Sequence, residues 1–360
     1  MIQATRLGLI LMALVLFFLT GCGGIGPKTV ARDRFEYTLA ISESWKRQML
    51  LNMVKIRYED TPVFLDVASI INQYALEGDI ELGARWTDGI LGNSQNIGGK
   101  AKYADRPTIT YQPLKGKKFT QSLMTPLPAG SLMAMVHAGW RVDLISRLCV
   151  QSMNGINNRS AFRLHIEEPD TEFFQLLTSL RKLQNSQATG VRVRKIKGEK
   201  PVNVIFFRRK DMDPDTIAEI DHIKKQLGLN PDLNEYQVVY GSASDNDRQI
   251  SILTRSMLQV LTSLAAYIDV PQIHVDEDRT TPNTAKKSDL EAGLMPLIQI
   301  QSATDKQKDT FVVIKYREHW YWIDDKDRRS KRMFTFLMFL FSLAETGERQ
   351  IAPVLTVPVG

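Results

Sequence analysis

The sequence predicts an α+β fold in which amphipathic helices are mixed with antiparallel hairpins. Several segments carry apolar residues at the spacing of a helix, and others alternate apolar and polar residues between turn residues. A regular strand–helix–strand order is typical of a parallel sheet, and these segments do not follow it. Helices and hairpins that follow one another irregularly therefore favour the α+β class.

The first expected element is a helix over residues 34–58, where Phe35, Leu39 and Met53 lie at helical separations. Less regular patterns follow it. Residues 61–76 are expected to be extended or to form a short helix, residues 88–100 are rich in Gly and Asn like a loop, and residues 106–114 alternate between prolines like an edge strand.

The middle of the chain has the clearest patterns. Asp213 is a good N-cap residue, and Pro214 after it suits the first position of a helix. The other elements expected here are helices over 129–154 and 170–184, a hairpin over 190–209, a strand over 235–240 and one long helix over 247–268.

After a polar stretch, residues 276–289, the C-terminal part is expected to contain antiparallel strands and a helix. One strand carries Val312, Ile314 and Tyr316, and its partner carries Trp320 and Trp322. The segment 333–344 is apolar all round, which is typical of a helix buried in protein and able to cap this sheet. It follows the basic run 326–332, so contact with a membrane surface is the alternative.

The elements suggest two lobes after the N-terminal region. Residues 34–160 would form a mainly helical lobe, and residues 161–360 would form an α+β lobe. A single continuous domain is the alternative.

The first residues have the architecture of a secretory signal. Arg6 precedes an apolar segment, Leu7 to Leu19, of 13 residues, and this is shorter than the ~20 residues that a membrane-spanning helix needs. Small residues then lead to Cys22. The sequence therefore predicts export, with residues 1–21 as the signal peptide.

The residues Leu19-Thr20-Gly21-Cys22 resemble the lipobox of bacterial lipoproteins. The resemblance covers only the first two dozen residues, and it implies that Cys22 carries a diacylglycerol thioether and becomes an acylated N-terminus. Residues 22–33 would then be the lipidated Cys and a short tether. Gly23 stands where an Asp would resemble an inner-membrane retention signal, so the resemblance implies the periplasmic face of the outer membrane. The remainder of the chain resembles only uncharacterised envelope lipoproteins of proteobacteria.

Cys149 is the other cysteine, so the mature chain has no pair for an internal disulfide. With His319 and Asp324 downstream, its order is similar to that of papain-like hydrolases. However, Cys149 lies near the end of an expected helix among apolar residues, where a free thiol behaves as a small hydrophobic group. A buried structural thiol is the favoured interpretation.

Two acidic, histidine-containing segments are weak candidates for metal sites. His274, Asp276 and Asp278 occupy alternate positions, which point the same way in an extended chain. The second segment contains His165, Glu167 and Glu168. Solvated acidic loops are the favoured interpretation of both, and no phosphate-binding loop is present. No metal or cofactor is expected.

The chain is basic, with a formal net charge of +6. The expected hairpin over 190–209 would gather basic residues into one patch: Arg192, Arg194, Lys195, Lys197, Arg208, Arg209 and Lys210. Such a patch would attract acidic lipid or an acidic envelope polymer. Nucleic acid fits the charge, but the expected compartment excludes it. A solvated, slightly basic surface is the alternative.

The favoured function is an interaction or assembly role for a lipid-anchored periplasmic envelope protein. This hypothesis depends on a strong anchor signal, a large folded body and no recognisable catalytic constellation. The alternative is a periplasmic hydrolase that uses Cys149 with a downstream His.

Overall fold

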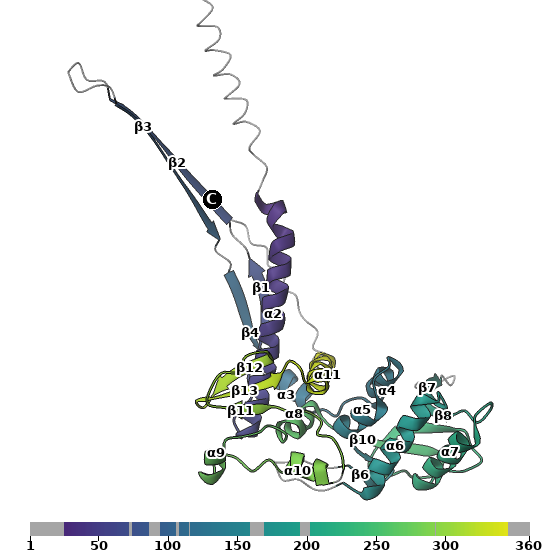
Figure 1. Ribbon diagram of the computed structural model, residues 1–360. Coiled ribbons are helices and arrows are strands. Elements are labelled where there is room, and N and C mark those ends of the chain that lie inside the picture. Colours follow the sequence, from purple (N-terminus) through teal and green to yellow (C-terminus); the bar gives the residue numbers. More distant parts are fainter. Residues whose placement is uncertain are drawn as a thin grey trace, which may run out of the picture. The chain divides into compact units, whose positions relative to one another are not determined.

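The computed structural model describes residues 25–71, 74–85, 94–105, 108–114, 116–158, 169–194, 202–291 and 293–344. It confirms the predicted α+β class, because helices are mixed with antiparallel strand pairs and a C-terminal antiparallel sheet (Figure 1). The chain divides into two compact units. The first contains residues 1–45 and 65–113, and the second contains residues 46–64 and 114–360.

This division does not coincide with the predicted boundary near residue 160. β5 (Val150–Met153) lies before that boundary and pairs with β10 (Gln249–Thr254), which lies after it. Hydrogen bonding between these strands joins both predicted lobes in one sheet. The segment 34–160 also contains the strands of the first unit, so it is not mainly helical.

The first unit combines the N-terminal part of a long helix with two strand pairs, and the rest of that helix belongs to the second unit. α2 (Ile25–Arg57) starts within the residues predicted to be a tether, and Pro27 falls in its first turn, where a missing N–H costs no helical hydrogen bond. β1 (Phe64–Ile71) pairs with β4 (Thr108–Leu114), and β2 (Tyr74–Arg85) pairs antiparallel with β3 (Ser94–Asp105).

The expected loop over 88–100 is therefore wrong from Ser94 onward. Gly and Asn are depleted in strands, but strand preference depends strongly on context. Here β2 supplies a paired residue opposite each residue from Ser94 to Asp105.

The second unit is built around a six-stranded sheet of order β6-β5-β10-β9-β8-β7. Its remaining strands are β6 (Ile156–Asn157), β7 (Thr189–Arg194), β8 (Val202–Phe207) and β9 (Glu235–Tyr240). Neighbouring strands are antiparallel except for β9 and β10. The register of β7 with β8 confirms the predicted hairpin.

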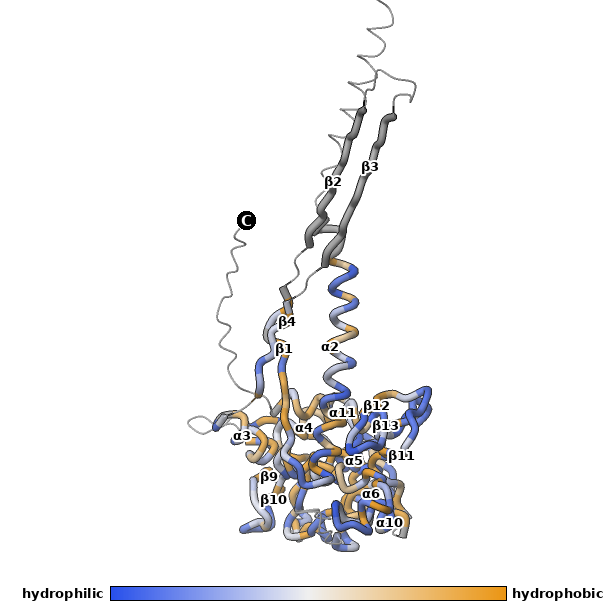
Figure 2. The backbone as a smooth tube through the Cα atoms, turned by 90° about the vertical axis from the view of Figure 1, so that its left-hand side faces the viewer, coloured by the Kyte–Doolittle hydropathy of each residue, from blue (hydrophilic) through white to orange (hydrophobic). Residues whose placement is uncertain are grey.

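Helices pack around this sheet and complete the core. They are α3 (Lys117–Met124), α4 (Ala129–His137), α5 (Val142–Cys149), α6 (Thr171–Asn185), α7 (Pro214–Gln226) and α8 (Met257–Ala265). The predicted cap of α7 is confirmed, since the Asp213 carboxylate accepts the Thr216 N–H at 2.8 Å. Figure 2 shows hydrophobic segments gathered among the helices and strands of this unit.

The predicted long helix over 247–268 is wrong in its first half. Residues 249–254 form β10, and the helix begins only after Ser256, which makes a capping box with Gln259. The apolar residues Ile250 and Ile252 alternate with Ser251, and β-branched residues favour strands. Short apolar runs fit both periods, so the spacing alone did not separate strand from helix.

The C-terminal prediction is confirmed. β12 (Thr310–Tyr316) pairs antiparallel with β13 (His319–Asp324), which also pairs with β11 (Gln301–Ala303). α11 (Arg328–Ala344) contacts this sheet through Phe334 and Phe311, whose ring centroids are 6.0 Å apart. The two short helices that precede it are α9 (Gln272–Asp276) and α10 (Thr284–Glu291).

One face of α11 remains exposed. Phe336 is 2% exposed, whereas Phe339 is 56% exposed. Residues three apart are neighbours on a helix, so the edge of the covered face of α11 runs between Phe336 and Phe339. A segment that is apolar all round does not indicate where that edge lies.

Candidate functional site

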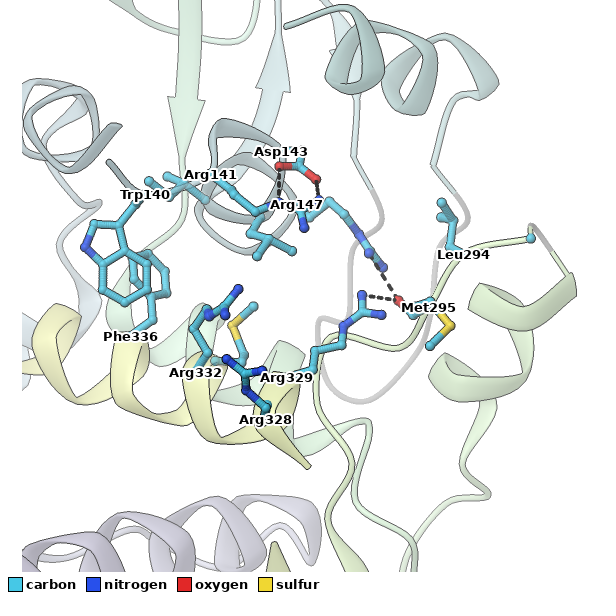
Figure 3. A pocket seen from close by; sticks show the side chains of 14 residues that line it. Trp140, Arg141, Asp143, Arg147, Leu294, Met295, Arg328, Arg329, Arg332 and Phe336 are labelled. Atoms are coloured by element: carbon cyan, nitrogen blue, oxygen red, sulfur yellow. Dashed lines mark hydrogen bonds and ion pairs between the residues drawn. The ribbon is translucent and has the colours of Figure 1, made fainter. Parts of the chain in front are cut away.

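The second unit contains a cavity of about 580 Å³ that five arginines line. We name it the arginine pocket (Figure 3). α5 and the two residues before it form one side, the start of α11 forms another, and residues 293–295 form a third. The lining residues that matter below are Trp140, Arg141, Asp143, Arg147, Met295, Arg328, Arg329, Arg332, Met333 and Phe336.

The start of α11 is fixed by Asp327. Its carboxylate accepts the backbone N–H groups of Arg329 and Ser330 at 3.1 and 3.0 Å, which is how an N-cap residue satisfies the free N–H groups of a first turn. Residues 329, 332, 333 and 336 then share one face of the helix. On this face, Arg329 and Arg332 lie nearer the N-terminus of the helix than Met333 and Phe336.

An aromatic pair forms the apolar wall of the arginine pocket. The rings of Trp140 and Phe336 lie with centroids 4.7 Å apart. Met333, also part of the lining, is buried. The pocket therefore combines an apolar wall with a cationic rim.

The two arginines on the α5 side have carboxylate partners. Arg141 donates to Asp143 through Nε and Nη2, at 3.1 and 2.6 Å, and this bonding raises the pKa of the Arg141 guanidinium. Arg147 donates to Asp289 at 3.0 Å, and the two side chains are 10% and 0% exposed. The Tyr267 hydroxyl also donates to Asp289, at 2.6 Å.

Two guanidinium groups from opposite sides meet at one backbone carbonyl. Arg147 and Arg329 donate to the Met295 oxygen at 3.2 and 2.9 Å (Figure 3). The pKa of Arg329 is lowered, mainly by burial and then by the positive charges of Arg147 and Arg141. Because both causes disfavour the charged guanidinium, an anion placed between these groups would stabilise it.

Lys331 of α11 pairs with Asp325, but the three arginines of this helix have no such partner within the part of the chain that the structure describes. There, Arg328, Arg329 and Arg332 form no ion pair with a carboxylate, and Arg328 and Arg332 are exposed. The N-terminus of a helix adds a partial positive charge of its own. Guanidinium groups bind phosphate or carboxylate through paired N–H donors. The geometry therefore suits an anionic group whose apolar portion rests on Trp140 and Phe336.

This pocket was not predicted from the sequence. The basic run 326–332 was interpreted only as a flank of the apolar segment, and neither Arg141 nor Arg147 was a candidate. The available signal was the spacing of Arg329 and Arg332 ahead of Phe336, which predicts a cationic end on the buried face of the helix.

Cys149 ends α5 and is fully buried. Burial raises the pKa of its thiol to about 12, against a smaller opposing effect of Arg255. Among the described residues, no histidine hydrogen bonds to it. Since thiolates rather than thiols are nucleophilic, this environment disfavours a catalytic role and agrees with a structural thiol.

His274, Asp276 and Asp278 do not share a face as predicted, because the first two lie in α9 rather than in an extended chain. His274 is buried, and its Nδ1 hydrogen bonds with the Tyr58 hydroxyl at 2.6 Å. Burial, and then the neighbouring His319, lowers the pKa of His274. Within the described ranges, no three His, Cys, Asp or Glu residues are grouped to hold a metal ion.

His274 belongs instead to a polar and aromatic cluster that joins the end of α2 to the β12–β13 hairpin. The Tyr58 hydroxyl also hydrogen bonds with that of Tyr321, at 2.6 Å. His319, a candidate partner of Cys149, packs its ring against His274 with centroids 4.9 Å apart. His319 therefore takes part in the packing of this cluster.

The predicted basic patch on the β7–β8 hairpin is divided between its two ends. Arg192 and Arg194 form ion pairs with Glu235. Arg209 pairs with Asp221 beyond the other end of β8. The register, in which Thr189 pairs with Phe207 and Arg194 with Val202, keeps these groups apart.

Several predicted residues lie outside the described residues. They are Cys22 with the rest of the lipobox, the candidates His165, Glu167 and Glu168, and the basic residues Lys195 and Lys197. Asp324, named with Cys149 and His319, ends β13, and its backbone carbonyl and side chain accept from the turn that follows.

The chain matches no known protein family, no curated protein and no solved structure. Of the helices in the described ranges, none combines the length and the apolar character needed to cross a bilayer.

Proposed function

We propose that this chain is a lipid-anchored protein of the periplasmic envelope with an interaction or assembly role. We further propose that the arginine pocket binds an anionic amphiphile of the envelope, with phosphate as the recognised group. The anchor is Cys22, by its lipobox resemblance, and Gly23 favours the outer membrane as its location. The membrane, through the lipid, and acidic envelope components are then its partners.

One observation carries the binding proposal. Arg328, Arg329 and Arg332 have no carboxylate partner among the described residues, and they lie beside the apolar wall of Trp140 and Phe336. Clustered cations repel one another, and the neighbouring carboxylates of Asp143 and Asp289 are bonded to other arginines. An anion relieves this repulsion, and the wall favours one that carries an apolar part. The buried Cys149 offers no comparable support for the hydrolase alternative.

The first test is titration calorimetry on a lipid-free chain that begins at Gly23 and keeps α2 complete. Its ligands are dihexanoyl phosphatidylglycerol below its micellar concentration, the zwitterionic dihexanoyl phosphatidylcholine, and inorganic phosphate. We expect phosphatidylglycerol to bind more tightly than either. The double variant R328Q/R332Q should weaken its binding at least tenfold, since hydrogen bonds to charged groups contribute about 1.5–3 kcal/mol each.

The matched control is R208Q/K210Q, which removes the same charge from two exposed residues outside the pocket. It should leave the affinity within about twofold, because screened surface charges act weakly at a distance. Equal losses in both variants would show that only net charge is recognised. Equal binding of the two lipids would contradict anion recognition.

The anchor is tested by Cys22→Ser in the full chain. This variant should remain an unlipidated, uncleaved precursor, because the lipobox resemblance implies that the peptidase acts on the lipid-modified form. Mass spectrometry of the native protein should identify an acylated N-terminal peptide that begins at Cys22. An unmodified mature terminus at another residue would refute the lipid anchor.

A further inference from the structure

β2 and β3 form a long two-stranded ribbon in the first unit (Figure 1). Each strand has 12 residues, and their register runs without a break from Tyr74–Asp105 to Arg85–Ser94. Strands of this length extend for about 40 Å. Among the described strands, neither has a third neighbour, so each strand has an outer edge that no described strand pairs with.

A two-stranded ribbon of this kind is at best marginally stable alone in water. Natural proteins protect open edges with short strands, prolines or bulges, but β2 and β3 contain no proline and their register has no shift. The ribbon is therefore built like a strand pair that is completed by further pairing.

The residue pattern divides the ribbon into two faces. Alternate positions of paired strands share a face. One set of positions is largely apolar: Leu76, Ile80 and Leu82 of β2 with Ile97, Ala101 and Tyr103 of β3. The other set holds most of the charges: Glu77, Asp79, Glu81 and Arg85 of β2 with Lys100 and Lys102 of β3.

The two strands differ in charge, and this difference selects a partner. Within the ribbon the register places Glu77 opposite Lys102 and Asp79 opposite Lys100. If the outer edge of β2 met the outer edge of β3 from a second chain, the same pairing of acidic and basic positions would recur. Pairing β2 with a second β2 would set acidic positions against one another, which destabilises strand pairing.

We propose that the ribbon is an interface between copies of this chain, in which β2 of one copy pairs antiparallel with β3 of the next. This is strand addition to an exposed edge, which takes its affinity from backbone hydrogen bonds and its specificity from residue type. The contact is heterologous, so each copy keeps one edge for another neighbour and the assembly grows into a closed ring or an open array.

Other exposed apolar residues in the same unit fit an assembly surface. Phe35 and Leu39 of α2 are 67% and 55% exposed, and Tyr111 of β4 is 57% exposed. Exposed apolar side chains supply area that an interface between copies can bury. These side chains would add apolar area to the proposed interface between copies.

The experiment uses the full lipidated chain in detergent and two charge variants that exchange signs between copies. E77K/D79K makes the two positions opposite Lys102 and Lys100 basic like their partners, and K100E/K102E makes the two positions opposite Glu77 and Asp79 acidic like theirs. Wild-type protein should be oligomeric by native mass spectrometry. Each variant alone should associate at least about tenfold more weakly, because like charges then face one another. Mixing the two should restore association, with a tag on one variant capturing the other.

A deletion keeps the test valid if either variant disorders its own ribbon. Residues 75–104 are replaced by a short Gly-Ser loop, and the melting temperature reports whether the second unit stays folded. The deleted chain should be monomeric. Monomeric wild-type protein, an oligomeric deletion variant, or a mixture of charge variants that does not associate would each overturn the proposal.

Discussion

Phe336→Ala should lower the free energy of unfolding by about 3–5 kcal/mol, the usual cost of truncating a buried Phe. The Phe336 side chain is 2% exposed, and its ring packs on Trp140 with centroids 4.7 Å apart. Against a total stability of about 5–15 kcal/mol, this loss is large. Urea unfolding of the chain that begins at Gly23, followed by tryptophan fluorescence, measures it.

Phe339→Ala is the matched control on the same helix. Phe339 is 56% exposed and touches Trp140 only edge-on, with centroids 6.3 Å apart. Its truncation should cost about 1 kcal/mol or less, as at most surface positions. Equal effects of the two substitutions would contradict the placement of α11. A Phe336 variant that kept its stability and lost binding to vesicles would instead indicate a helix lying on a membrane.

Elements defined by neighbouring residues could be predicted from the sequence. The start of α7 depends on Asp213 and Pro214, and both signals act within one helical turn. The β12–β13 hairpin is similar, since its strands are adjacent and its two turn residues, Arg317 and Glu318, have positive φ. In both cases the information that fixes the backbone lies within a few residues.

Elements defined by distant partners were harder to predict. β10 is a strand because β5 and β9 lie on either side of it, and its apolar spacing also fitted a helix. β3 is a strand despite its glycines because β2 pairs with it along its whole length. The sequence pattern alone contains neither partner, so the period of the apolar residues left both assignments open.

The arginine pocket was beyond sequence analysis for the same reason. Arg147 and Arg329 are far apart in the chain and meet only at the Met295 carbonyl. A single basic residue on a helix is normally solvated. Convergence of like charges becomes visible only when α5, α11 and residues 293–295 are placed together.

Asp289 should be the most costly charged residue to remove near the arginine pocket. Its side chain is fully buried, and it accepts hydrogen bonds from Arg147 and Tyr267 at 3.0 and 2.6 Å. Asp289→Ala leaves the nearly buried Arg147 guanidinium without its counter-charge. Breaking a buried ion pair in this way costs about 3–5 kcal/mol, which urea unfolding would measure.

Asp143→Ala separates this effect from the loss of charge alone. It removes the same charge, but its partner Arg141 is 45% exposed at the side chain, so water replaces the lost carboxylate and the cost should be about 1 kcal/mol or less.

The double variant R147M/D289L should be more stable than Asp289→Ala, because it leaves no unpaired charge in the interior. If Asp289→Ala cost no more than Asp143→Ala, Asp289 would not be what holds Arg147 at the pocket. If the double variant were no more stable than Asp289→Ala, the cost would come from lost packing rather than from the stranded guanidinium.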